Sequence, residues 1–242
     1  MVQNGHQPQV AAGFGQFMIA PQIAEATASH LEQTIKNPKT TPFDTHPPLS
    51  ARIEKARSWK AASVDANTNP AISLIDDLPT LELSLLRKVL PGVSDKALTP
   101  VDWQTLGEDV YVPMWRSQTA ALLPILAKHN IGDVPDLLKR LDPITSQLKD
   151  PPGTLLTRDQ RSDRAASVVQ SALILALIQN GWTLHAKPGF VSLASGDMQL
   201  EPGRIFPQLR SGILKKEDWL TYCEKAGIGQ WPLATLADAA TA

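Results

Sequence analysis

The side chains in this sequence that are best suited to metal binding or nucleophilic chemistry are five histidines and one cysteine. The histidines are His6, His30, His46, His129 and His185. No two of them are four residues apart and none precedes a glutamate, so the H-E-x-x-H pattern, which places two imidazoles and a general base on one helix, is absent. Cys223 is the only cysteine, which excludes a disulfide within the chain and a zinc site built from cysteines.

Other candidate groups have structural explanations. Asp76 and Asp77 could form an acid pair, but they precede Leu78-Pro79 and a leucine stripe, which favours helix capping. Cys223 lies at helical spacing from Trp219, so we expect a packed thiol rather than a nucleophile. The motifs G-x-S-x-G, G-x-G-x-x-G and the P-loop do not occur.

The segment 43–53, FDTHPPLSARI, predicts the start of a helix, preceded by residues whose backbone conformation is restricted. Asp44 or Thr45 can cap free backbone N–H groups, and the two following prolines fix φ for the first turn. Because the residue before a proline is disfavoured in the α region, His46 is expected at a rigid, non-helical corner. Arg52 would lie one turn into the helix, where it can pair with a carboxylate. By spacing alone, the segment is better explained as a capped helix start with a surface histidine, because caps far outnumber catalytic sites.

This segment resembles the T-H-P-P-L-x-x-R-I element that follows the active site in HtpX-like and CAAX-prenyl-protease-like zinc metallopeptidases (metallopeptidase family forty-eight). Its flanks are similar to a bacterial branch of that family at 13–17 (GFGQF), 74–78 (LIDDL) and 111–116 (YVPMWR). From 117 to 242 the similarity is only general.

The resemblance implies roles for two residues. The family's histidine at the position of His46 lies near the zinc cleft, which implies that His46 helps to stabilise a tetrahedral intermediate, as an electrophilic group and not as a metal ligand or base. Arg52 would form an orienting ion pair. The family's zinc ligands, H-E-x-x-H and a later glutamate, do not occur in this chain, so we expect no cofactor here and zinc in the catalytic portion of the parent protein.

The expected function is therefore that of the C-terminal, non-catalytic portion of a membrane-associated zinc metalloendopeptidase, which is inactive by itself in proteolysis. Its expected partner is the missing catalytic and membrane portion or a second copy of this chain. The alternative is a stand-alone α-rich protein-interaction module derived from such a peptidase. The resemblance also implies a soluble portion of a bacterial membrane-associated protein that faces the cytoplasm.

Composition narrows the alternatives. The 242 residues are 43% hydrophobic and carry a formal net charge of −1, which does not favour a nucleic-acid-binding surface. The most apolar run, 165–178, is shorter than the roughly 18–20 residues that span a bilayer, and the first ten residues are too polar for a signal peptide. We therefore predict neither a direct membrane span nor nucleic acid as a partner.

The pattern of apolar residues predicts a mostly α fold with a small antiparallel β-meander near the C-terminus. We expect a helical segment at 1–60 that carries the T-H-P-P element, a linker at 61–72, and an α-rich domain at 73–242 with the sheet at about 182–201.

Several individual elements are predicted from caps and periodicity. Helices are expected at about 21–36, from the prolines at 47–48, over the leucine stripe 78–89, and at 115–129, 134–141, 158–179 and 215–226. Thr99 and Pro100 are expected to start another helix, and 110–112 is expected to be extended.

The early part of the chain also predicts a docking surface, within about 13–57. Phe14, Phe17 and Met18 form an apolar cluster, and Leu49 and Ile53 add apolar surface on the next helix. We expect this surface to pack against the missing catalytic core and to be partly uncovered without it.

Overall fold

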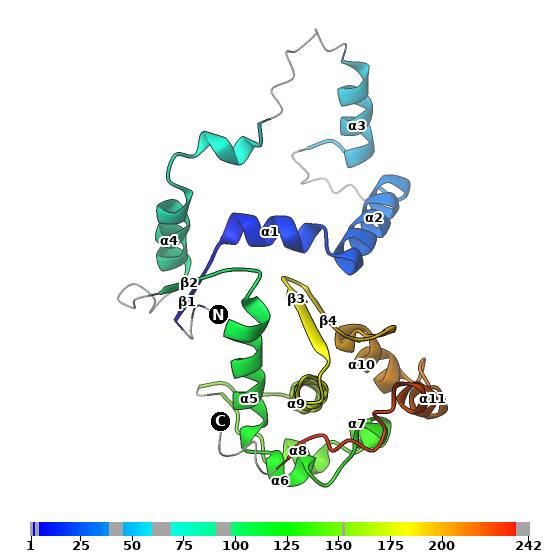
Figure 1. Ribbon diagram of the computed structural model, residues 1–242. Helices are drawn as coiled ribbons and strands as arrows, with labels where there is room; N and C mark the ends of the chain where they lie inside the picture. Colours follow the sequence, from blue (N-terminus) through cyan, green and yellow to red (C-terminus); the bar gives the residue numbers. More distant parts are fainter. Residues whose placement is uncertain are drawn as a thin grey trace. The chain divides into compact units, whose positions relative to one another are not determined.

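The computed structural model describes residues 2, 5–38, 46–59, 69–90, 98–151 and 153–235 of the chain (Figure 1). The chain divides into two compact units, an N-terminal unit, Met1–Pro100, and a C-terminal unit, Val101–Ala242. The predicted linker at 61–72 falls mostly on residues outside the described ranges.

The N-terminal unit is built mainly from helices. Its elements are β1 (His6–Pro8), α1 (Val10–Met18), α2 (Pro21–Lys36), α3 (Leu49–Ser58), η2 (Ala71–Leu74) and α4 (Leu78–Val89). Proline lies in the first turn of α2 and of α4, where its missing N–H costs nothing. Asp77 caps α4 by accepting a hydrogen bond from the Thr80 backbone N–H at 3.2 Å, which confirms the expected capping role.

The helix start predicted at Thr99 is wrong. Thr99–Val101 is strand β2, paired with β1, and the Thr99 backbone N–H donates to the Gly5 carbonyl at 2.9 Å. The pairing partner lies more than 90 positions earlier in the sequence, so local cap chemistry could not reveal it.

The C-terminal unit holds the main hydrophobic core. After the π-helical turn η3 (Gly107–Tyr111), its elements are α5 (Val112–Ala120), α6 (Leu123–Leu126), η4 (Ile131–Asp133), α7 (Val134–Lys139), α8 (Asp142–Thr145), α9 (Arg158–Gln179), β3 (Thr183–Lys187), β4 (Phe190–Ser195), β5 (Met198–Leu200), α10 (Pro202–Ser211) and α11 (Lys216–Ala226).

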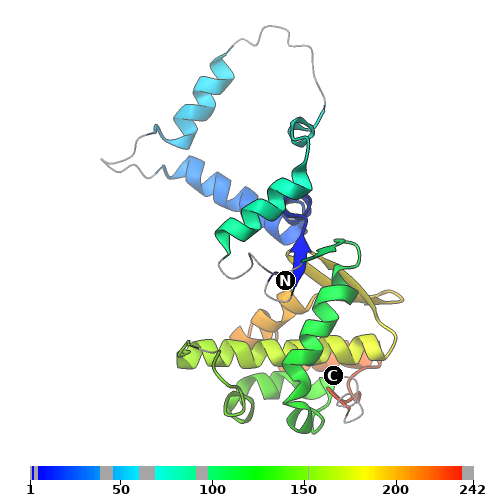
Figure 2. The ribbon, with the colours of Figure 1, turned by 90° about the vertical axis from the view of Figure 1, so that its left-hand side faces the viewer.

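Helix α9 is the centre of this unit, and its predicted bounds are confirmed. It starts at a capping box in which Thr157 and Gln160 exchange side-chain-to-backbone hydrogen bonds of 3.2 and 2.9 Å. From Ala165 onward most of its residues are buried, and α5 crosses and packs against it (Figure 2). A helix that is apolar on nearly all sides and too short to span a bilayer is expected in a hydrophobic core. Burial of each large apolar side chain stabilises the folded state by roughly 1.5–3 kcal/mol.

The extended piece predicted at 110–112 is also wrong, because these residues are helical. Leu106 and Val110 are four positions apart and both buried, and Gly107 allows β3 to approach closely. A Cβ at Gly107 would lie 2.8 Å from Leu184 Cδ2. Packing against β3 therefore decides the helical conformation at a site where valine and tyrosine favour a strand by propensity.

The β-meander is confirmed. Strands β3, β4 and β5 are consecutive neighbours and antiparallel, and the register pairs Lys187 with Phe190 across a two-residue turn. Gly189 and Gly196 have φ of 76° and 53°, which an L side chain rarely adopts.

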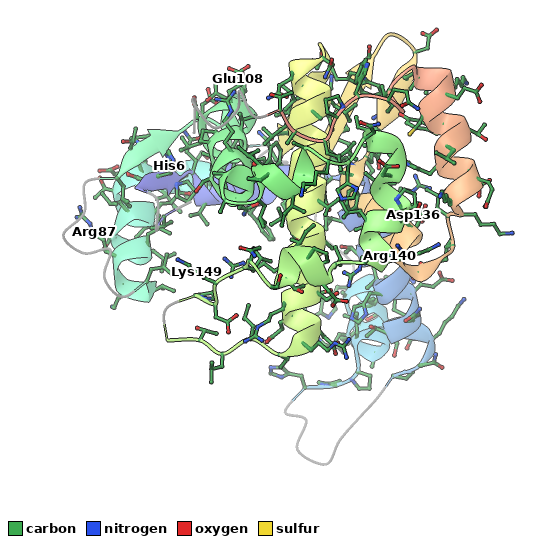
Figure 3. The ribbon with its side chains drawn as sticks, turned by 90° about the horizontal axis from the view of Figure 1, so that it is seen from below. His6, Arg87, Glu108, Asp136, Arg140 and Lys149 are labelled. Atoms are coloured by element: carbon green, nitrogen blue, oxygen red, sulfur yellow. The ribbon has the colours of Figure 1, made fainter. Side chains whose placement is uncertain are left out.

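Two contacts connect α11 to the middle of the C-terminal unit. The buried Trp219 indole N–H donates to the Ile131 carbonyl at 3.0 Å. Lys216 pairs with Asp136, which lies on α7 (Figure 3). The mostly α fold with a small antiparallel sheet near the C-terminus is thus confirmed. Of the helices in the described ranges, none combines the length and apolar character needed to cross a bilayer.

Candidate functional site

The residues before α3 are non-helical at His46, as the sequence predicts, but the helix begins only after both prolines. His46 is exposed and precedes the helix, and Pro48 has φ −50° and ψ 149°, outside the α region. The Arg52 backbone N–H donates to the Pro48 carbonyl at 3.1 Å, which closes the first turn. The expected caps Asp44 and Thr45 lie outside the described residues. The two prolines therefore present His46 to solvent at the start of a short helix.

Arg52 is exposed on the first turn of α3. The ion pairs found in the described part of the chain are Lys36–Glu32, Arg161–Asp150, Arg210–Asp163 and Lys216–Asp136. Arg52 takes part in none of these four, so its expected ion pair stays a prediction.

The described residues do not fit a zinc site. His6 lies on β1, His30 on α2, His129 before η4 and His185 on β3, so the histidines come from separate elements. Within the ranges that the structure describes, no group of three or more His, Cys, Asp or Glu side chains could hold a metal ion. Because tetrahedral zinc needs three or four such ligands in one place, no catalytic step through a metal is assigned to these residues.

Apolar side chains are exposed mainly in the N-terminal unit. Of the sixteen large apolar side chains that are exposed in the described ranges, thirteen lie between Val10 and Leu90, and the other three are Leu155, Ile213 and Leu220. Phe14 is 63% and Trp59 71% exposed, at the middle of α1 and the end of α3. Exposed apolar side chains that form a contiguous patch are typical of a binding surface, so their concentration in this unit makes it the candidate interface.

The predicted docking residues are only partly uncovered. Phe14 is exposed, whereas Phe17, Met18, Leu49 and Ile53 are half-buried. The structure therefore brings this region to the surface through α1 and the T-H-P-P corner, and it does not bury Phe14 or His46 against the rest of the chain.

The C-terminal unit has cavities of its own, lined by residues of that unit. One cavity of about 420 Å³ lies between β5, α10 and α11, with Arg204, Ile205 and Tyr222 in its wall. The Tyr222 hydroxyl donates to the Gln199 carbonyl at 2.9 Å, and burial, followed by the charge of neighbouring Cys223, raises the pKa of Tyr222 to about 12. The phenol therefore stays protonated near neutral pH and is a poor general base there.

Cys223 is a packed thiol, as expected. It lies on the buried side of α11, and burial raises the pKa of the thiol to about 12. A thiol in this state carries almost no thiolate at neutral pH and is not a nucleophile.

Sequence reasoning missed one residue of structural importance, Glu82. It lies within the leucine stripe of α4, is only 7% exposed, and accepts a hydrogen bond from the Ala11 backbone N–H at 2.7 Å. Helix α1 has no side-chain cap of its own, so Glu82 supplies one from α4. The signal in the sequence was an acid inside an apolar stripe.

A scan of protein-family models, a search of curated proteins and a search of solved structures returned no match to this chain.

Proposed function

We propose that this chain is the C-terminal, non-catalytic portion of a membrane-associated bacterial zinc metalloendopeptidase, and that its N-terminal unit docks on the catalytic portion, which lies outside this chain. The observation that carries the proposal is the exposed pair His46 and Pro47 within a helical unit that has many exposed apolar side chains. In the parent protein the chain would face the cytoplasm.

His46 would act in the docked state. Its imidazole is exposed at a corner that two prolines hold rigid, so it can reach into a neighbouring cleft without loss of helix. A donor held in this way stabilises an oxyanion because little reorganisation is needed as charge develops. In the catalytic portion, zinc would activate the attacking water. Arg52 would orient the corner by pairing with a carboxylate of that portion.

The apolar residues of the N-terminal unit supply the affinity in this proposal. Phe14 and Trp59 are the type of aromatic anchor that dominates binding energy when it enters a pocket. Burial of these two side chains in a partner would remove apolar surface from water, which is favourable. This supports a docking role for the N-terminal unit.

The alternative function is a stand-alone α-rich interaction module, because the same exposed apolar residues would suit any protein partner. The DNA directly upstream of the codon for Met1 separates the two. An adjacent or continuous reading frame that encodes apolar segments and H-E-x-x-H supports the peptidase origin, and an unrelated gene there counts against it.

Co-expression of that upstream catalytic portion with this chain tests docking directly. We expect the two to co-purify, and we expect Phe14→Ser combined with Trp59→Ser to reduce recovery of the complex at least about tenfold, the loss that removal of an aromatic anchor typically causes. Leu155→Ser is the matched control, because Leu155 is exposed but lies in the C-terminal unit. Equal losses for the control, or none for the double variant, would disprove docking through this surface.

A further inference from the structure

Helix α4 has an apolar face that the described residues leave uncovered. Leu81, Leu85 and Val89 are 53%, 51% and 63% exposed and succeed one another at four-residue spacing, so they form one line along the helix. Leu78, Glu82 and Leu86 lie on a different line and are half-buried or buried. We call the first three residues the α4 face.

The two ends of α4 carry opposite charges next to this face. Asp77 lies four positions before Leu81, and Lys88 lies three positions after Leu85 and one before Val89. Both side chains are exposed. Asp76 and Arg87 repeat the same signs, and Arg87 projects from the helix in Figure 3. A helix that is acidic at its start and basic at its end matches its own charge pattern when a second copy runs antiparallel to it.

The apolar and charged pairings require the same register. If Leu81 of one helix lies opposite Leu85 of the other, the midpoint of the pair is at position 83. Asp77 then lies beside Lys88 of the second copy at both ends, since those two residues are also centred near 83. Twelve residues span roughly 18 Å, which brings both pairs within one contact surface. A two-fold axis at the midpoint repeats every contact.

From this agreement we propose that two copies of the chain associate through their α4 faces as an antiparallel, two-fold symmetric pair. The interface does not use α3, His46 or Phe14, so it is compatible with docking of those residues elsewhere. Two short helices bury less than the roughly 1,200 Å² of a standard interface, so the dimer is expected to be weak, with a Kd of about 1–100 µM.

Sedimentation velocity of the purified full chain over about 1–200 µM, a range chosen to bracket that Kd, tests the proposal. We expect a monomer–dimer equilibrium that Leu81→Gln with Leu85→Gln shifts to monomer at all these concentrations. Leu31→Gln with Ile35→Gln is the matched control, because these two residues form a similar exposed pair on α2 and should leave the equilibrium unchanged. Circular dichroism checks that each variant keeps its helices.

A charge reversal at Lys88 provides the second arm. Lys88→Glu places like charges at both ends of the pair and should weaken the dimer about tenfold, whereas Lys88→Arg keeps the charge and should leave association unchanged. Asp77 is left in place because it caps α4. A wild-type chain that is monomeric throughout the range would overturn the proposal and leave the α4 face to a different partner. A dimer that survives the Leu81 and Leu85 changes, or that Lys88→Glu leaves unchanged, would also overturn it.

Discussion

Two neighbouring side chains on α11, Tyr222 and Cys223, have raised pKa values that originate from burial. The thiol pKa rises from 9.0 and the phenol pKa from 10.0, each to about 12. In both cases the folded protein favours the neutral form. The contribution of the two neutral groups to the stability of the folded state is therefore complete below their pKa values in the unfolded chain. It is lost as the pH rises from about 9 to about 12.

We predict that the free energy of unfolding of the C-terminal unit decreases steadily above about pH 9, the ordinary thiol pKa, and that Cys223→Ala makes the decrease smaller between pH 9 and 10. Urea unfolding followed by tryptophan fluorescence measures both. Reaction with a thiol reagent at pH 8 provides the control: the native thiol should react far more slowly than the unfolded one. A native Cys223 that reacts as fast as in urea would contradict its burial.

At the scale of elements, α1 depends on α4 for its N-terminal cap. The Glu82 carboxylate accepts from the Ala11 N–H, and the N-cap residue Gln9 supplies no side-chain cap. A negative group at a helix N-terminus also interacts favourably with the helix dipole. This one hydrogen bond connects residues that are 71 positions apart.

Glu82→Ala should reduce protection of the α1 backbone from hydrogen exchange by about 1 kcal/mol, since a half-buried N–H loses its acceptor. Glu82→Gln keeps an acceptor oxygen and should cause a smaller loss. Amide exchange of α1 measures both, with Glu25→Ala on exposed α2 as the control. Unchanged exchange at Ala11 in Glu82→Ala would show that this cap does not stabilise α1.

For the whole molecule, the distribution of histidines over separate elements predicts that the purified chain holds no stoichiometric zinc and cleaves no unfolded protein. Metal analysis after dialysis measures the first, and digestion of unfolded casein the second. About one zinc per chain that disappears with His46→Ala would contradict the assignment of His46 as a helper without a metal. The mixture with the catalytic portion is the positive control for activity.

The sequence by itself determined the features that depend on neighbours along the chain. Prolines predicted the starts of α2 and α3, and the apolar pattern closed by Asn180 and Gly181 predicted the bounds of α9. The two glycine turns fixed the β-meander. It also predicted a non-helical corner at His46, because two prolines restrict the backbone regardless of what lies around them.

Tertiary structure decided what local chemistry leaves open. Thr99–Val101 became a strand because a distant strand pairs with it, and 110–112 became helical because Leu106 and Val110 pack against the core near β3. Glu82 became a cap because α4 lies beside the start of α1. Leu81, Leu85 and Val89 stayed exposed because the described residues do not cover that side of α4. Pairing and burial depend on residues far apart in the sequence, so periodicity can predict an apolar face but not whether this chain covers it.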